Sequence, residues 1–210
     1  MKTDDLIDAL ARDASPPRVS HTGRFVAALG AGLAIALVLT GTFLGFRPDL
    51  GVAVMPVMGK SVFSAVAASV SIPVLLRLAR PGRPVGWRIG AVIGFVALCA
   101  ALTAIALMGE DPASRMTAWT SGRFPWCIVT IPLLGAPTAA CLVFVLRDLA
   151  PTRPDLSGAA LGGVAGGVGA IAYAMYCPVD SIAFVTTWYA VAIGFCAAIG
   201  AVLGTRLLRW

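Results

Sequence analysis

The sequence contains little charge. Only 12% of its 210 residues are Asp, Glu, Lys or Arg, roughly half the share of a typical soluble domain. Hydrophobic residues make up 59% of the chain, the mean hydropathy is +0.89, and the apolar residues gather in long runs. We therefore expect an all-α, polytopic membrane protein built as one helical bundle, without a separate soluble domain.

The sequence also lacks the usual signatures of catalysis. It has one histidine, His21, and no HExxH, GxSxG, phosphate-binding loop or CxxC motif. Few ionisable residues fall inside the apolar runs, so a proton or ion pathway would have no groups at the midplane. We expect no enzyme and no obligatory cofactor. Two weaker alternatives are a small transporter or permease subunit, which should show midplane polar groups or repeats, and a membrane thiol oxidoreductase, which should show a CxxC or quinone site.

Six apolar runs approach the length needed to cross a hydrocarbon core of roughly 30 Å. The second run is the shortest and contains Pro73 and several serines. The sequence divides into an N-terminal tail, residues 1–24, and a six-helix membrane domain, residues 25–210. The expected spans are Phe25–Phe46, Ser61–Leu78, Trp87–Met108, Trp126–Leu146, Leu156–Tyr176 and Ser181–Leu207.

The basic residues predict the orientation of the chain. If the tail is cytoplasmic, only Arg47, Lys60, Arg115 and Arg123 lie outside, and the other 12 of the 16 Lys and Arg lie inside. Cytoplasmic segments of membrane proteins carry this excess. We therefore expect both termini in the cytoplasm. The net charge of +6 is explained by arginines at the ends of apolar runs, so we expect lipid contact and no direct nucleic-acid binding.

The five cysteines separate by depth. Cys99, Cys141 and Cys196 fall inside apolar runs and are expected to be ordinary core residues. Cys127 begins the fourth run and Cys177 follows the fifth, so both reach the outer boundary. In an oxidising compartment such a pair can form a disulfide or bind a soft metal. From position alone, a functional cysteine pair and two unrelated interfacial cysteines are about equally supported. Position also does not distinguish a disulfide from a metal site.

The tail predicts a short amphipathic helix. Thr3 can cap it, and aspartates in the first turn favour the positive end of the helix dipole. Pro16 and Pro17 would end it. Four aspartates disfavour the alternative of a tail lying on an anionic membrane surface, so we favour docking in the apolar groove of a partner. The candidate partner-binding residues are Asp4, Asp5, Leu6, Ile7, Asp8 and Leu10.

The fifth run is rich in glycine. Gly158, Gly162 and Gly166 recur at four-residue steps, and Gly200 and Gly204 repeat the step in the sixth run. Small residues at this spacing let a neighbouring helix backbone approach closely. We expect intramolecular packing, with the fourth run as the neighbour of the fifth.

Several stretches together resemble the six-pass anti-sigma factors of the negative regulator of sigma F (NrsF) family over nearly the whole chain. Two departures are Tyr176, where a histidine is common before the second cysteine, and Val179, where an acidic residue is common, with Asp180 one step later. The stretches that carry the resemblance are the opening TDDLIDALARD, Cys127 with Ile131-Pro132, the segment Ala172-Tyr-Ala-Met-Tyr-Cys-Pro178, Phe184 with Trp188-Tyr189, and the ending Gly204-Thr-Arg-Leu-Leu-Arg-Trp210.

The resemblance implies an inner-membrane protein that keeps an extracytoplasmic-function sigma factor inactive. It implies that the N-terminal segment contacts the sigma factor. It also implies that Cys127 and Cys177 sense heavy-metal or redox stress, either as a thiol pair or as ligands of a soft metal ion that serves as the signal. The two departures weaken a metal-ligand role for the neighbours of Cys177 and leave the cysteine pair intact.

Overall fold

The computed structural model describes residues 3, 8, 21–79, 86–121, 124–147, 149, 151 and 153–208. These residues form helices and connecting segments, and none of them is in a strand. Six helical segments are long and apolar enough to cross a membrane, which confirms the predicted all-α class and the number of spans. The segments are α2 (His21–Leu39) with η1 (Thr40–Leu44), α3 (Val54–Leu78), α4 (Trp87–Met108), α6 (Phe124–Arg147), α7 (Pro154–Ala174), and α8 (Ile182–Phe184) with η2 (Val185–Tyr189) and α9 (Ala190–Leu207).

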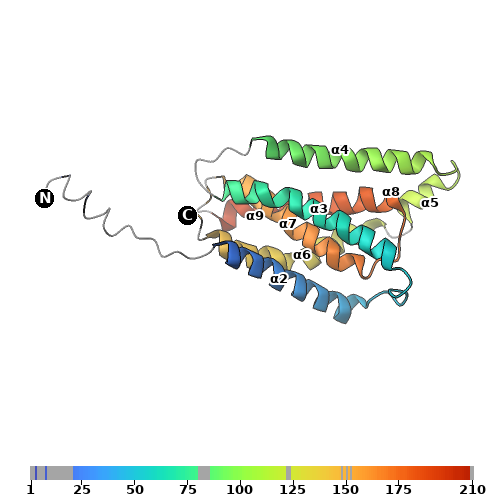
Figure 1. Cartoon of the computed structure of the whole chain (residues 1–210), viewed down its shortest axis with the longest axis horizontal. Helices are drawn as coiled ribbons and strands as arrows, with labels where there is room; N and C mark the ends of the chain where they lie inside the picture. The colour runs from blue at the N-terminus through green and yellow to red at the C-terminus, as the bar shows by residue number, and fades with distance from the viewer. Residues whose placement is uncertain are drawn as a thin grey trace.

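The bundle has two distinct ends, which can be followed along the helices in Figure 1. We call the end at which α2 begins and α9 ends the tail end. The opposite end, where α2 leads into the segment before α3 and where α7 is joined to α8, is called the cysteine end. A short helix, α5 (Arg115–Thr120), lies at the cysteine end within the region expected to be an outer loop.

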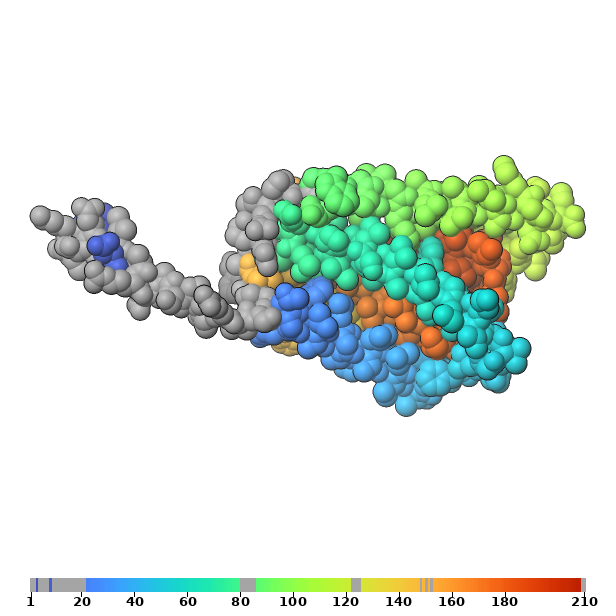
Figure 2. Space-filling view, viewed as in Figure 1, coloured from blue at the N-terminus to red at the C-terminus, as the bar shows by residue number. Residues whose placement is uncertain are grey.

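Helix α7 is the centre of the bundle and α4 is its margin. In an apolar stretch of 18 residues taken from each helix, 83% of the stretch is buried in α7 but only 6% in α4. Helices α9, α3 and α6 surround α7, whereas α4 lies along one edge of the molecule in Figures 1 and 2. Exposed apolar side chains such as Ile93, Val96 and Phe144 give the bundle a surface suited to lipid.

The glycines of α7 permit close packing against more than one neighbour. Gly169 lies against the backbone of Ile131 and Gly135 in α6, the neighbour we expected. A Cβ atom at Gly158 would collide with the backbone of Gly200, and one at Gly162 would collide with Cys196 and Ala197. This face of α7 therefore packs against α9 rather than against α6. The reason is that α9 carries its own glycine step, so the two backbones can approach each other from both sides.

The second span is also longer than the sequence suggested. Helix α3 has 25 residues and begins at Val54 rather than Ser61. Pro56 falls in its first turn, where a missing backbone N–H breaks no intrahelical bond. Lys60, which we expected at the boundary, lies inside the helix because its ammonium group finds polar partners there. The first helix likewise begins early, at His21, inside the residues assigned to the tail.

Candidate functional site

The structure brings Cys127 and Cys177 together at the cysteine end. Cys127 lies in the first turn of α6 and Cys177 three residues after α7. Both are completely buried, belong to one core cluster, and are free thiols. The Cys127 thiol also donates a hydrogen bond of 3.4 Å to the hydroxyl of Tyr173. Both cysteines therefore lie at one end of the bundle, as predicted, but they are buried in the core rather than exposed at a boundary.

Two tyrosines complete the surroundings of the thiols. The rings of Tyr173 and Tyr189 lie 5.7 Å apart and both are buried. The Tyr189 hydroxyl is among the groups that interact with the Cys177 thiol. Tyr189 belongs to η2, a π-helical turn of a kind frequent at functional sites. Sequence reasoning did not select these tyrosines, although both lie in stretches that carry the family resemblance.

A buried lysine lies beside the thiol pair. Lys60 is 3% exposed, and its Nζ donates hydrogen bonds to the carbonyl oxygens of Cys177 (2.7 Å) and Val179 (3.1 Å). It also forms an ion pair with Asp180 at 2.8 Å. All three ammonium hydrogens therefore have acceptors, which is how a cation can remain charged in an apolar bundle.

A buried arginine joins the same network from the other side. The Arg47 guanidinium bonds both carboxylate oxygens of Asp180, at 3.0 and 3.3 Å, and both of Asp49, at 2.7 and 2.8 Å. It donates a further bond to the Cys177 carbonyl oxygen at 3.3 Å. We call Arg47, Asp49, Lys60 and Asp180 the charged cluster. Its two positive and two negative charges balance.

The electrostatics of this end favour the charged forms of Cys177 and Asp180. A hydrogen bond between the two thiols, opposed by burial and helped by the Val179 amide and the Lys60 charge, lowers the pKa of Cys177. Partial desolvation opposes the shift of Asp180, but hydrogen bonds from Arg47 and Lys60 hold the pKa of its carboxyl below the ordinary value. A thiol with a lowered pKa is the more reactive nucleophile and metal ligand.

The donor set limits what the site can bind. No group of three or more His, Cys, Asp or Glu gathers as a metal site in the part of the chain that the structure describes. Asp180 is the acidic residue nearest to Cys177 in the sequence, and its carboxylate is already bonded to Arg47 through both oxygens and to Lys60 through one. Two thiols suit a soft ion of low coordination number, or oxidation to a disulfide, better than a tetrahedral zinc site.

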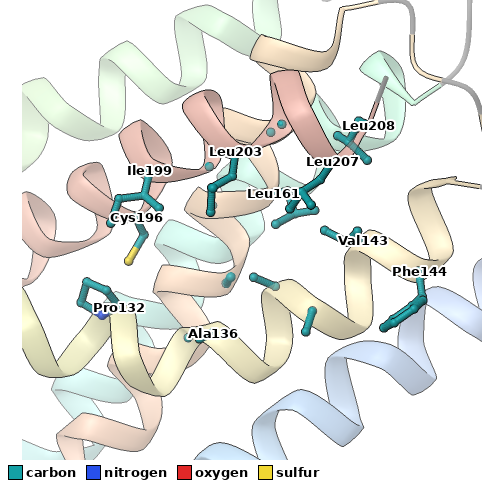
Figure 3. A pocket seen from close by; sticks show the side chains of 18 of the residues that line it. Pro132, Ala136, Val143, Phe144, Leu161, Cys196, Ile199, Leu203, Leu207 and Leu208 are labelled. Carbon is teal, nitrogen blue, oxygen red and sulfur yellow. The ribbon is translucent and has the colours of Figure 1, made fainter. Parts of the chain in front are cut away.

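The other cysteines lie elsewhere. Cys99 and Cys196 are buried, and Cys141 is partly buried. Cys196 lines an apolar groove of about 450 Å³ between α6, α7 and α9, shown in Figure 3 with Leu203 and Phe144. This groove presents aliphatic side chains and glycine backbone, with Arg147 at its margin, and it offers no constellation for catalysis.

Most of the tail lies outside the described residues. Asp8 is described as helical and exposed, and the other five candidate partner-binding residues, Asp4, Asp5, Leu6, Ile7 and Leu10, fall outside. Their role stays a prediction.

Comparison with known proteins agrees with the sequence resemblance. The family described as "Negative regulator of sigma F" matches residues 10–210. A "Probable anti-sigma-F factor NrsF" of Azospira oryzae is 36% identical, and an "Anti-sigma-F factor NrsF" of Caulobacter vibrioides is 37% identical, each over the full length of both chains. No solved structure matches the chain. With a family match over nearly its whole length and two relatives of this identity, the chain belongs to the NrsF family of negative regulators of sigma F.

Proposed function

We propose that the protein is an anti-sigma factor of the bacterial inner membrane that sequesters an extracytoplasmic-function sigma factor. The observation that carries this proposal is full-length similarity to two proteins named as anti-sigma-F factors. A membrane bundle with six spans provides an anchor that holds a bound partner away from DNA. We assign no enzymatic role to the protein, since its action is to bind and release.

The tail is the proposed sigma-binding element. Leu6, Ile7 and Leu10 would form the apolar face of a short helix, and Asp4, Asp5 and Asp8 would surround that face with negative charge. A helix of this type binds in an apolar groove, where a few buried aliphatic side chains supply most of the affinity.

The buried thiol pair is the proposed sensor. Heavy-metal ions or thiol-oxidising conditions would act on Cys127 and Cys177, where two thiols lie against Tyr173 and the Lys60 charge. Binding of a soft cation by both thiols would release two protons to water. Oxidation would join the two sulfurs, pass two electrons to the oxidant and release the two thiol protons. Either event releases the sigma factor only if it stabilises one arrangement of the bundle over another.

The direct test is co-purification. The full chain, carrying an affinity tag and solubilised in mild detergent, should retain an extracytoplasmic-function sigma factor identifiable by mass spectrometry. A chain in which Leu6, Ile7 and Leu10 are replaced by Ala should not retain it. Absence of any sigma factor from the wild-type complex, in cells that express the candidate sigma factors, would overturn the proposal.

A further inference from the structure

The segment between α7 and α8 is held by its own backbone N–H bonds to the end of α7 and by groups from distant parts of the chain. The backbone N–H of Arg47 donates to the Met175 carbonyl at 3.1 Å. The carbonyl of Cys177 accepts from both the Arg47 guanidinium and the Lys60 ammonium, at 3.3 and 2.7 Å. The N–H of Cys177 is bonded to Tyr173 of α7 at 3.0 Å, but its carbonyl is held by two cations that belong to neither flanking helix.

These cations come from two separate elements, and Asp180 connects them. Arg47 lies three residues beyond η1, which continues α2, whereas Lys60 lies in the second turn of α3. Asp180 accepts from both, and it directly precedes the Ser181 cap of α8. The charged cluster therefore joins α2, α3 and the segment that carries Cys177 at one point.

Helix α2 leads from this point to the other end of the molecule. Together, α2 and η1 run without interruption from His21 to Leu44, and the proposed sigma-binding residues precede α2 in the sequence. Helix α2 also packs against α6, whose first turn contains Cys127. A displacement of Arg47 would therefore act on the helix that follows the proposed sigma-binding residues along the chain.

We propose that Arg47 and Lys60, bridged by Asp180, are positioning residues that couple the state of Cys177 to α2 and α3, and so to the tail. This inference rests on the proposed function. When both thiols bind a soft cation or become a disulfide, the Cys177 main chain shifts, and its carbonyl no longer meets both cations. The cluster then separates, and α2 is free to take the arrangement that releases the sigma factor.

The test asks whether the charged cluster acts after the thiols. Asp180→Asn keeps the shape of the side chain but removes the charge that both cations require. We expect Asp180→Asn to raise sigma-dependent transcription at least tenfold without any inducer, at an unchanged amount of protein in the membrane. The double variant Asp180→Asn with Cys177→Ser should remain equally derepressed, because the cluster acts after the thiols. Asp111→Asn, in the exposed region before α5, is the matched control and should repress normally.

Two results would overturn the inference. One is normal repression and normal induction in Asp180→Asn and in Lys60→Met. The other is a double variant that represses as tightly as Cys177→Ser alone. If Asp180→Asn does not accumulate in the membrane, Lys60→Arg takes its place as the test, because this variant keeps the positive charge but changes the geometry of its hydrogen bonds.

A changed sensitivity of Lys60→Arg to the inducer supports the inference. Wild-type sensitivity of this variant contradicts it. Normal induction of Cys177→Ser by itself would instead refute the sensing role that the proposed function assigns to the thiols.

Discussion

The two ends of the bundle are held together by different kinds of interaction. Towards the tail end, α7 and α9 meet through glycines whose backbones are in direct contact, as at Gly158 and Gly200. At the cysteine end, the connecting segments are held by ion pairs and by hydrogen bonds to carbonyl oxygens from Lys60 and Arg47. The two thiols lie only at this second end.

This difference between the two ends indicates where a chemical signal can act. Backbone packing at glycines has no group that a metal or oxidant could change, and close-packed interiors transmit displacement rather than absorb it. In a buried ion pair, by contrast, removing one partner leaves an uncompensated charge, which favours a different arrangement of the surrounding groups. We therefore interpret the cysteine end as the part that switches and the α7–α9 contact as the rigid part.

The largest effect is expected when a side chain is introduced into the glycine contact between α7 and α9. Gly200→Leu would place a side chain against the Gly158 carbonyl, where no flexible neighbour can move away. We expect loss of folded protein from the membrane, because overpacking costs about 1–3 kcal/mol even where neighbours can adjust. Gly194→Leu, in the same helix but with open space beside it, should accumulate normally. Equal amounts of the two variants by immunoblot would contradict the rigid packing.

Removing the apolar face of the tail should leave the fold intact and abolish binding. Replacing Leu6, Ile7 and Leu10 with Ala removes aliphatic contacts that together contribute roughly 4 kcal/mol, or about three decades in Kd. Titration of the sigma factor onto the purified chain measures this effect. Neutralising Asp4, Asp5 and Asp8 to Asn should give a smaller loss that disappears at high salt. Wild-type affinity in a chain lacking residues 2–14 would move the binding element elsewhere.

The thiols should control induction without controlling binding. We expect Cys127→Ser or Cys177→Ser to reduce induction by cadmium or a thiol oxidant to the uninduced level. The double variant should be no worse, because the two sulfurs act as one unit. Sigma binding by each variant should match that of the wild type. Replacing Cys99, Cys141 and Cys196 together with Ala is the control, and a reporter for the sigma factor measures all four proteins.

The smallest expected effect is that of acid. The pKa of Asp180 is lowered in the folded protein, so its contribution to stability is present above the ordinary value of about 4 and is lost only as pH falls through the lowered value. The charged groups that face Asp180 are Arg47, Lys60 and Asp49. Asp180 therefore gives no reason for sigma retention to differ between pH 5.5 and pH 7.5, whereas the Cys177 thiol, whose pKa is lowered to about 6, changes charge in this range. We expect at most a small change in retention, and a marked release at pH 5.5 that persists in Cys177→Ser would show that another group at this end titrates.

Much of the architecture could be predicted from the sequence, because lipid imposes a simple rule of length and hydropathy. The six spans and the shared end of Cys127 and Cys177 followed from that rule. The start of α3 could not be predicted in this way, because a lysine in an apolar run normally indicates the end of a span. Only in the folded chain does Lys60 meet carbonyl oxygens from residues more than 100 positions away.

The parts that could not be predicted depend on which helices become neighbours. The glycine pattern indicated close packing, but only the structure identifies α9 as the partner of that face. Arg47, Tyr173 and Tyr189 were not selected from the sequence for the same reason: each reaches the thiols or the charged cluster only through tertiary contacts.

The central claim is that chemistry at the thiol pair controls sigma binding through the bundle. The most direct measurement uses the full chain in lipid nanodiscs with its fluorescently labelled sigma factor, and follows dissociation on addition of cadmium ions. The account predicts release from the wild-type chain, and no release from Cys127→Ser or Cys177→Ser, which bind the sigma factor equally well before the addition. Equal release from all three proteins, or retention by the wild-type chain at cadmium concentrations that induce the regulon in cells, would contradict it.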